Sequence, residues 1–253
     1  LRAAQQNGSY DYHPHHVVLL EKPSGGQRPI MVHTSLNDKI IERAVYFAIR
    51  EVLHEKLNNG VSYCGIPSLK QKQRVPNIQD AHIRLAEHIH SKEKWIMKAD
   101  IASFFDSLNK KKVMSLLEDH LPDNSLQSFF CSWVDVRFDN PEQLPSNINK
   151  DKGVPQGSCL SSIIANLYLL EFDDNRKKGN VSLLRYADDL TLSCCTEAQL
   201  KSERRQVEDD LRKIDLYFKD EKVDTLRPGE GTHFLGYRHN KGKVYVEDEK
   251  VSE

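Results

Sequence analysis

The sequence predicts an α+β fold in which an antiparallel sheet packs on helices. Three observations support this prediction. Short apolar runs alternate with longer helical patterns, two apolar strands flank an Asp-Asp pair, and the element order over 94–246 fits a split β-α-β core. The chain has 253 residues, enough for one large or two modest domains with a buried core.

The predicted strands are short apolar segments bounded by Gly, Pro, Asn or Asp. In chain order they are 17–20, 28–32, 95–100, 183–186, 190–194, 234–237 and 244–246. The first two are expected to form a hairpin around the Pro-Ser-Gly-Gly turn at 23–26. The fourth and fifth are expected to form a second hairpin with Asp188 and Asp189 at its tip.

The predicted helices follow from apolar residues that recur at i, i+3, i+4 and i+7. The first begins with a cap at Ser35 or Asn37 and ends at Leu57, and its apolar face includes Ile40 and Val52. The other predicted helices span 77–91, 109–120, 123–137, 160–173 and 197–220. The stretches 61–76 and 139–152 are polar and are predicted to be loops.

Composition excludes several classes of protein. No apolar run approaches the roughly 18 residues of a membrane span, so we expect no membrane association. A formal net charge of −1 means that any nucleic-acid contact must use local basic patches. Five cysteines without a paired spacing indicate neither a disulfide framework nor a zinc motif, and favour a reducing, cytoplasmic compartment. Because the sequence starts at Leu1 without an initiator Met, we expect a fragment or a trimmed chain.

Three histidines lie close together near the N-terminus, at His13, His15 and His16. Such a cluster can bind a metal ion. No further ligand is spaced to complete a site, so the favoured interpretation is an N-terminal extension that leads into the first strand.

Acidic residues occupy positions where a charge is costly. Asp100 ends an apolar strand, and Asp188 and Asp189 separate two others. Like charges placed together need a cation to neutralise them. Carboxylate oxygens suit Mg²⁺, with Mn²⁺ as an alternative, and two such ions support in-line phosphoryl displacement. An Asp-Asp pair alone is more often a turn, so the other motifs decide.

Four motifs occur in order along the chain. They are KADIASFFD at 98–106, GVPQGSCLS at 153–161, RYADDL at 185–190 and FLGY at 234–237. As a set they resemble bacterial reverse transcriptases of the group II intron, retron, CRISPR-associated and phage-defence kinds. The resemblance extends over most of the chain, from about 17 to 237. It implies a right-hand polymerase fold with fingers and palm.

The resemblance implies roles for individual residues. Asp100, Asp188 and Asp189 match the catalytic, metal-binding acids, and the backbone of Ile101 matches a further metal ligand. The backbone of Ile101 and Ala102 would face the incoming triphosphate.

Further matches concern the incoming dNTP. Phe105 matches the ring that excludes a 2′-hydroxyl, and Gln156 matches a residue beside the nucleotide. Lys22 and Arg28 match the pair that grips the triphosphate. Lys222 matches a lysine that protonates pyrophosphate, and Lys219 competes with it for that role.

The resemblance also predicts the domains. Residues 1–93 would form the N-terminal part of the fingers, 94–108 and 151–253 the palm, and 109–150 the connecting helices and loop. Only 16 residues follow Tyr237, so the thumb is expected to be absent or to lie outside this chain.

The predicted function is RNA-directed DNA synthesis from dNTPs on a primer 3′-hydroxyl, in a bacterial mobile element, CRISPR adaptation or antiphage defence. Expected partners are an RNA template, a nucleic-acid primer and an associated RNA or protein. Two alternatives stay open: template-independent or protein-primed DNA synthesis by the same fold, and a non-catalytic nucleic-acid-binding module.

Overall fold

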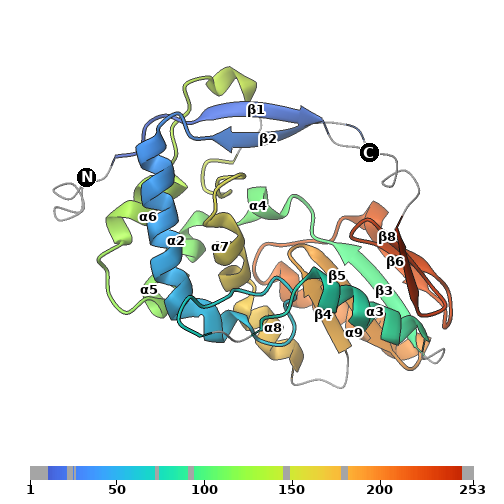
Figure 1. The fold of residues 1–253 in the computed structure, drawn as a ribbon. Helices are drawn as coiled ribbons and strands as arrows, with labels where there is room; N and C mark the ends of the chain where they lie inside the picture. Colours follow the sequence, from blue (N-terminus) through green and yellow to red (C-terminus); the bar gives the residue numbers. More distant parts are fainter. Residues whose placement is uncertain are drawn as a thin grey trace. The chain divides into compact units, whose positions relative to one another are not determined.

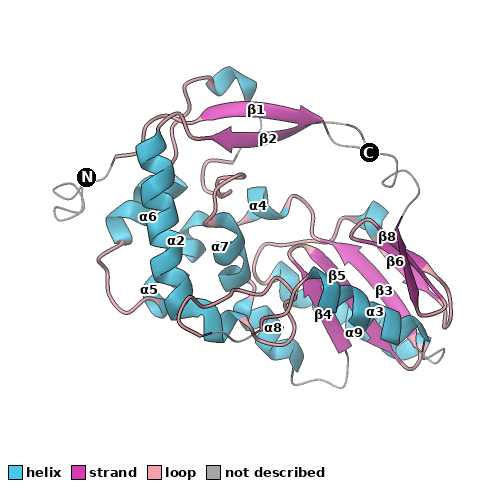
Figure 2. Cartoon of the chain, in the orientation of Figure 1, coloured by secondary structure: helices cyan, strands magenta, loops and turns pink. Residues whose placement is uncertain are grey.

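The computed structural model of the chain describes residues 11–21, 25, 27–71, 74–90, 94–144, 149–177 and 182–246. The chain divides into two compact units (Figures 1 and 2). Unit 1 comprises Leu1–His54, Ser68–Gln71 and Phe105–Tyr168, and unit 2 comprises Glu55–Pro67, Lys72–Phe104 and Leu169–Glu253. No helix in the described ranges is both long and apolar enough to cross a membrane. All five cysteines are free.

Unit 1 combines the first hairpin with a set of helices. Its elements are β1 (His16–Glu21), β2 (Gln27–Val32), most of α2 (Leu36–Leu57), most of α4 (Phe104–Ser107), α5 (Lys110–His120), α6 (Gln127–Val134), the 3₁₀ turn η1 (Pro141–Gln143) and α7 (Ser161–Tyr168). β1 and β2 pair antiparallel, which confirms the predicted hairpin. The α2 helix also has its predicted extent, but Ile40 and Val52 on its expected apolar face are exposed. The buried face of α2 is therefore narrower than the predicted apolar face. Its buried residues Ile41, Val45 and Ile49 follow one another at intervals of four and form a single row along the helix.

Unit 2 contains two sheets and three helices of more than one turn among its described residues. Its elements are α3 (Ile78–His90), β3 (Trp95–Asp100), α8 (Leu170–Lys177), β4 (Ser182–Tyr186), β5 (Asp189–Cys194), α9 (Glu197–Arg212), the 3₁₀ turn η2 (Asp220–Lys222), β6 (Asp224–Leu226), β7 (Thr232–Phe234), β8 (Tyr237–Asn240) and β9 (Lys243–Val246). The main sheet has the strand order β4-β5-β3-β6, and all of its pairs are antiparallel. This order confirms the predicted split β-α-β core.

Both faces of the main sheet are buried. Leu85 and Ile89 of α3 pack with Ile96 and Leu184 of the sheet, whereas α9 contacts β3 and β5. In the view of Figure 1, α3 lies in front of the sheet and α9 behind it. Neighbouring residues on β3, Ile96 and Met97, are accordingly both fully buried, since side chains alternate between the faces of a strand.

Three sequence predictions of helix length were wrong. The helix predicted over 160–173 is two helices, α7 and α8, with a break at Leu169 where the chain passes between units. The one predicted over 123–137 is confined to α6. The helix predicted to extend to residue 220 ends at Arg212, because Asp215 adopts a left-handed conformation with φ 60°.

The FLGY segment is a turn and not the predicted strand. Leu235 and Gly236 have positive φ values of 47° and 79°, and they connect β7 to β8. Two successive positive φ values are typical of a type I′ hairpin turn. The short strand β6 was not predicted from the sequence, because three residues give too little periodicity to recognise.

Candidate active site

The three predicted catalytic acids lie at one end of the main sheet in unit 2. Asp100 is the last residue of β3 and Asp189 the first of β5, and the two are register partners. The backbone N–H of Ile101 donates to the carbonyl oxygen of Asp188 at 3.1 Å. The strand pairing that the apolar runs predict therefore brings together carboxylates nearly 90 residues apart in the sequence.

The turn that carries Asp188 is strained. Tyr186 and Asp189 pair across the β4–β5 hairpin, leaving Ala187 and Asp188 as its two loop residues. Ala187 has φ 53°, a conformation that usually requires glycine and costs another residue about 1–2 kcal/mol. Strain of this kind is common where the backbone presents a functional side chain.

Burial and like charges oppose ionisation of Asp189. Burial raises the pKa of its carboxyl group to about 6, and the negative charges of Asp188 and Asp100 add to the rise. Two lysines oppose it: Lys222 and Lys98 favour the ionised form. Burial in turn lowers the pKa of Lys98, which donates to the side-chain oxygen of Thr232 at 3.0 Å.

Lys222 contacts one of the predicted catalytic acids directly. Its ammonium group donates to the carboxylate of Asp100, and this hydrogen bond raises the pKa of Lys222. The competing Lys219 directs its ammonium group to Glu221 at 3.4 Å. Only the backbone of Lys219 reaches Asp100, through an N–H that donates to the Asp100 carbonyl at 2.8 Å. The structure thus distinguishes the two lysines by the partners of their ammonium groups, which the sequence did not reveal.

The acids fit a hard divalent cation by their chemistry. Their oxygens are the ligand type that Mg²⁺ prefers, and a cation would relieve the repulsion that raises the pKa of Asp189. Among the described residues, however, these three acids do not form a cluster with one oxygen from each within 4.8 Å of the others. The Lys222 ammonium supplies positive charge at Asp100 instead.

The predicted backbone contacts at Ile101 and Ala102 lie beside the acids. Ile101 is buried, and its N–H donates to the Asp188 carbonyl. The N–H of Ala102 donates to the carbonyl of Tyr217 at 2.9 Å. This hydrogen bond joins the segment after β3 to the segment before η2.

The remaining predicted nucleotide-binding residues belong to unit 1 or fall outside the described ranges. Lys22 lies outside them, and Arg28 is exposed on β2. Phe105 is half-buried, and its carbonyl accepts from Val154 at 3.0 Å. Gln156 donates from its amide to Asp106 at 2.6 Å, so unit 1 brings Gln156 next to the residue that follows Phe105.

Gly157 fixes the loop that carries Gln156. Its φ is 106°, and a Cβ there would lie 2.7 Å from the carbonyl oxygen of Met31. The backbone of Met31 donates to the Gln156 carbonyl at 2.8 Å. Only glycine permits this approach of the loop to β2.

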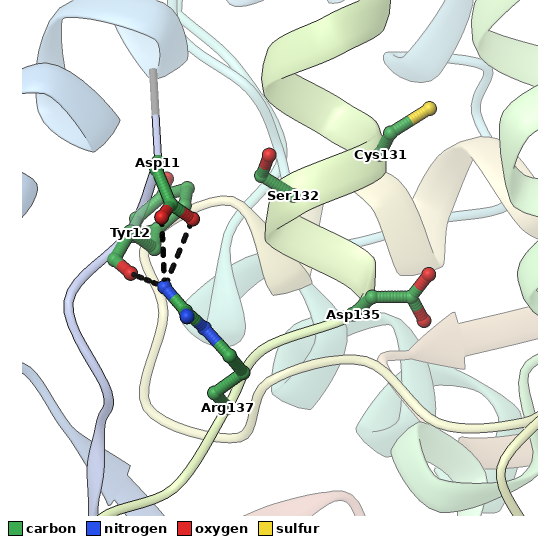
Figure 3. A pocket seen from close by; sticks show the side chains of 6 residues that line it. All are labelled: Asp11, Tyr12, Cys131, Ser132, Asp135 and Arg137. Atoms are coloured by element: carbon green, nitrogen blue, oxygen red, sulfur yellow. Dashed lines mark hydrogen bonds and ion pairs between the residues drawn. The ribbon is translucent and has the colours of Figure 1, made fainter. Parts of the chain in front are cut away.

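An open pocket of about 410 Å³ lies elsewhere in unit 1. Figure 3 shows the Arg137 guanidinium directed at Asp11 and at the Tyr12 carbonyl, with distances of 2.9 and 3.0 Å. Asp135, on the same pocket wall, pairs with Lys110. These charges are already matched, and the pocket contains none of the predicted site residues.

Comparison with known proteins identifies the family. Residues 20–239 match the model of the family described as Reverse transcriptase (RNA-dependent DNA polymerase). The chain belongs to this family. This match confirms the resemblance that the four motifs indicated, and the mixed fold agrees with it.

Known proteins that are similar to the chain share limited identity with it. Protein YkfC of Escherichia coli K12 is 22% identical over 94% of the chain and 70% of its own length. The Retron Se72 reverse transcriptase of Salmonella heidelberg is 31% identical over 46% of the chain and 28% of its own length. The apo telomerase of Candida tropicalis superposes with a TM-score of 0.66 at 16% identity, covering 94% of the chain and 49% of the telomerase chain.

Sequence reasoning missed a buried ion pair that supports the reverse transcriptase motif RYADDL. The Arg185 guanidinium donates to both carboxylate oxygens of Asp173, and one of these contacts measures 2.9 Å. Arg185 also donates to the carbonyl of Ala187 at 3.1 Å. Asn59 donates to the same Asp173 carboxylate at 2.9 Å. A charged residue inside each of two apolar segments was the available signal.

Proposed function

We propose that this chain synthesises DNA on an RNA template, adding dNTPs to a primer 3′-hydroxyl. The observation that carries the proposal is the pairing of Asp100 with Asp189, with Asp188 joined to Ile101, in a member of the reverse transcriptase family. Asp100, Asp188 and Asp189 would hold Mg²⁺, together with the Ile101 backbone. When bound, such ions lower the pKa of an attacking hydroxyl and stabilise the leaving pyrophosphate.

The other residues are proposed to bind and orient the nucleotide. Lys222 would donate a proton to the leaving pyrophosphate, because it carries its proton as an ammonium group placed at Asp100. Phe105 would exclude a 2′-hydroxyl, and Gln156, held by Asp106, would lie beside the base. Lys22 and Arg28 would neutralise the triphosphate.

The partners and the biological setting are proposals as well. An RNA template, a nucleic-acid primer and dNTPs follow from the family's activity. The retron relative favours a role in a bacterial mobile element or defence system, in the cytoplasm. The fingers and palm assignments predicted from the motifs are retained as part of this proposal.

Primer extension tests the proposal. The native protein is incubated with an RNA template, a labelled DNA primer, Mg²⁺ and either dNTPs or rNTPs, with an established family polymerase as positive control. We expect template-copied DNA that disappears in Asp188→Asn and when EDTA replaces Mg²⁺. The matched control is Asp174→Asn, which removes an exposed carboxylate of α8 and should leave synthesis unchanged.

Other outcomes would replace the proposal. DNA made without a template would support the template-independent or protein-primed alternative. Nucleic-acid binding without synthesis, and independent of Mg²⁺ and dNTPs, would support the non-catalytic alternative. Equal synthesis by native protein and Asp188→Asn would show that these acids are not the catalytic group.

A further inference from the structure

A second group of potential metal ligands lies in unit 1, apart from the catalytic acids. His15 precedes β1, His33 follows β2, and Glu42 lies on α2. One ligand atom from each of these side chains lies within 4.8 Å of the other two. Zinc ligands at about 2.0–2.2 Å from a tetrahedral ion are themselves about 3–4 Å apart, so small side-chain rotations would complete such a site.

The group is buried and its hydrogen bonding is incomplete. His15 and Glu42 are 2% and 1% exposed. Within the described part of the chain, the Nδ1 atoms of His15 and His33 and the Oε2 atom of Glu42 have no hydrogen-bond partner. His33 Nε2 lies 3.0 Å from Glu42 Oε2, but the contact lacks hydrogen-bond alignment. Buried polar atoms without partners are uncommon in proteins, and a missing ion is one explanation for them.

The Glu42 carboxylate is already oriented for a ligand. Its Oε1 atom accepts from the Ser158 hydroxyl and from the backbone N–H of Cys159 at 2.9 Å. The free oxygen, Oε2, is therefore turned toward His33. Partners that fix the second oxygen of a ligating carboxylate are typical of metal sites.

The backbone of His15 is held equally firmly. Its N–H donates to the Arg137 carbonyl at 2.8 Å, and its carbonyl accepts from Asp139 at 3.0 Å. The Tyr12 ring packs on both imidazoles, with centroid distances of 5.6 Å to His15 and 6.5 Å to His33. An aromatic side chain packed on the ligands of a metal site limits the access of water to the metal ion.

We propose that His15, His33 and Glu42 form a Zn²⁺ site with three protein ligands, which leaves the fourth tetrahedral position to water. Two imidazole nitrogens and one carboxylate oxygen match zinc, whereas Mg²⁺ prefers oxygen ligands only. Bound zinc would join the segment before β1, the end of β2 and helix α2, and through Glu42 the loop that follows Gln156. His13 and His16, the two histidines that lie near His15 in the sequence, are not part of this site, because His13 pairs with Asp38 and His16 with Asp139.

Zinc titration of chelator-treated protein tests the proposal. Excess Mg²⁺ is present so that the catalytic acids do not compete, and a reductant keeps the thiols reduced. We expect one Zn²⁺ per chain by elemental analysis after dialysis. At a free Zn²⁺ concentration 100-fold above its dissociation constant, the melting temperature should rise by about 5–10 °C.

Variants decide whether these residues hold the ion. His15→Gln and His33→Gln should each abolish both the bound zinc and the shift, while circular dichroism confirms that each variant folds. Ser158→Ala keeps all three ligands but removes one of the two hydrogen bonds to Glu42 Oε1, and should weaken zinc binding about 10–100-fold. His16→Gln is the matched control, since it removes an exposed neighbouring histidine and should bind zinc as the native protein does.

Two results would overturn the zinc site. One is a native protein whose melting temperature does not change with Zn²⁺ and which retains no stoichiometric zinc, which would identify the group as a metal-free hydrogen-bonding cluster. The other is zinc binding that survives unchanged in both His15→Gln and His33→Gln, which would place the ion on other ligands.

Discussion

Arg185 and Asp173 form a buried ion pair that joins strand β4 to helix α8. Their side chains are 1% and 0% exposed, and Arg185 also donates to the carbonyl of Ala187 in the turn that presents Asp188. The buried arginine that precedes the tyrosine of the RYADDL motif therefore holds the turn through the Ala187 carbonyl. We infer that the pair positions the acids proposed to be catalytic and does not act on the substrate.

Breaking this pair should strongly destabilise the protein. Asp173→Asn leaves the Arg185 charge buried without a counter-charge, and we expect a loss of about 3–5 kcal/mol in unfolding free energy. Denaturant unfolding measures the loss. The matched control on the same helix is Asp174→Asn, which breaks the exposed Lys177–Asp174 pair and should cost less than about 1 kcal/mol.

A double variant separates stability from positioning. Arg185→Met with Asp173→Leu removes both charges, so much of the lost stability should return. The hydrogen bond to the Ala187 carbonyl does not return, and kcat for primer extension should therefore stay below the native value with little change in KM. Recovery of native kcat together with stability would show that the pair is only structural.

His88 should make the protein sensitive to acid. The residue is buried between α3 and the sheet, with Nδ1 2.7 Å from the Ser193 hydroxyl and Nε2 3.2 Å from that of Ser182. These serines are register partners on β4 and β5. Burial lowers the pKa of His88 to about 4, whereas an unfolded histidine titrates near 6.5.

The stability linked to His88 is therefore complete above pH 6.5 and lost as the pH falls toward 4. The full difference corresponds to about 3 kcal/mol. Replacement by a non-titrating residue, His88→Gln, should flatten the decline in unfolding free energy between pH 6.5 and 4. His90→Gln, at an exposed position of the same helix, should follow the native curve. A native-like decline in His88→Gln would assign the acid sensitivity to other groups.

The parts of the fold with a strong local pattern were predictable. The hairpin that carries Asp188 and Asp189 follows from two apolar strands around a polar turn, and β3 follows from an apolar run that ends in Asp100. These elements bring the acids together. Periodicity thus places each acid at the end of a strand, and the predicted split β-α-β order brings the two strands side by side.

Features that depend on distant contacts were not predictable. The early end of α9 results from the left-handed conformation of Asp215, which its residue type does not require. In the sequence His15 is grouped with His13 and His16, but in the fold it meets Glu42, 27 positions away, because the segment before β1 folds against α2. Likewise, only the folded chain distinguishes Lys222 from Lys219.

Lys222 should contribute to turnover and not to folding. If its ammonium group protonates pyrophosphate, Lys222→Met should lower the single-turnover rate about 100-fold, the lower range for general acid catalysis. Its side chain is 48% exposed, so unfolding free energy should change little. Lys219→Met is the matched control and should stay near the native rate, because that ammonium group faces Glu221. Equal losses in the two variants would argue against a specific role for Lys222.

Phe105 should determine the choice between dNTPs and rNTPs. The ring is half-buried at the point where the chain passes from unit 2 to unit 1. Replacing it with a smaller side chain, as in Phe105→Ala, removes the bulk proposed to exclude a 2′-hydroxyl. We expect the ratio of kcat/KM for dNTP over rNTP to fall by about 10–100-fold, the range typical of a steric pocket contact.

The neighbouring phenylalanine provides the control for this effect. Phe104 is 3% exposed and belongs to the core of unit 2, so Phe104→Leu should lower the unfolding free energy by roughly 1 kcal/mol. It should leave the dNTP to rNTP ratio unchanged. A ratio that stays native in Phe105→Ala, or that falls equally in both variants, would mean that discrimination does not depend on the Phe105 ring.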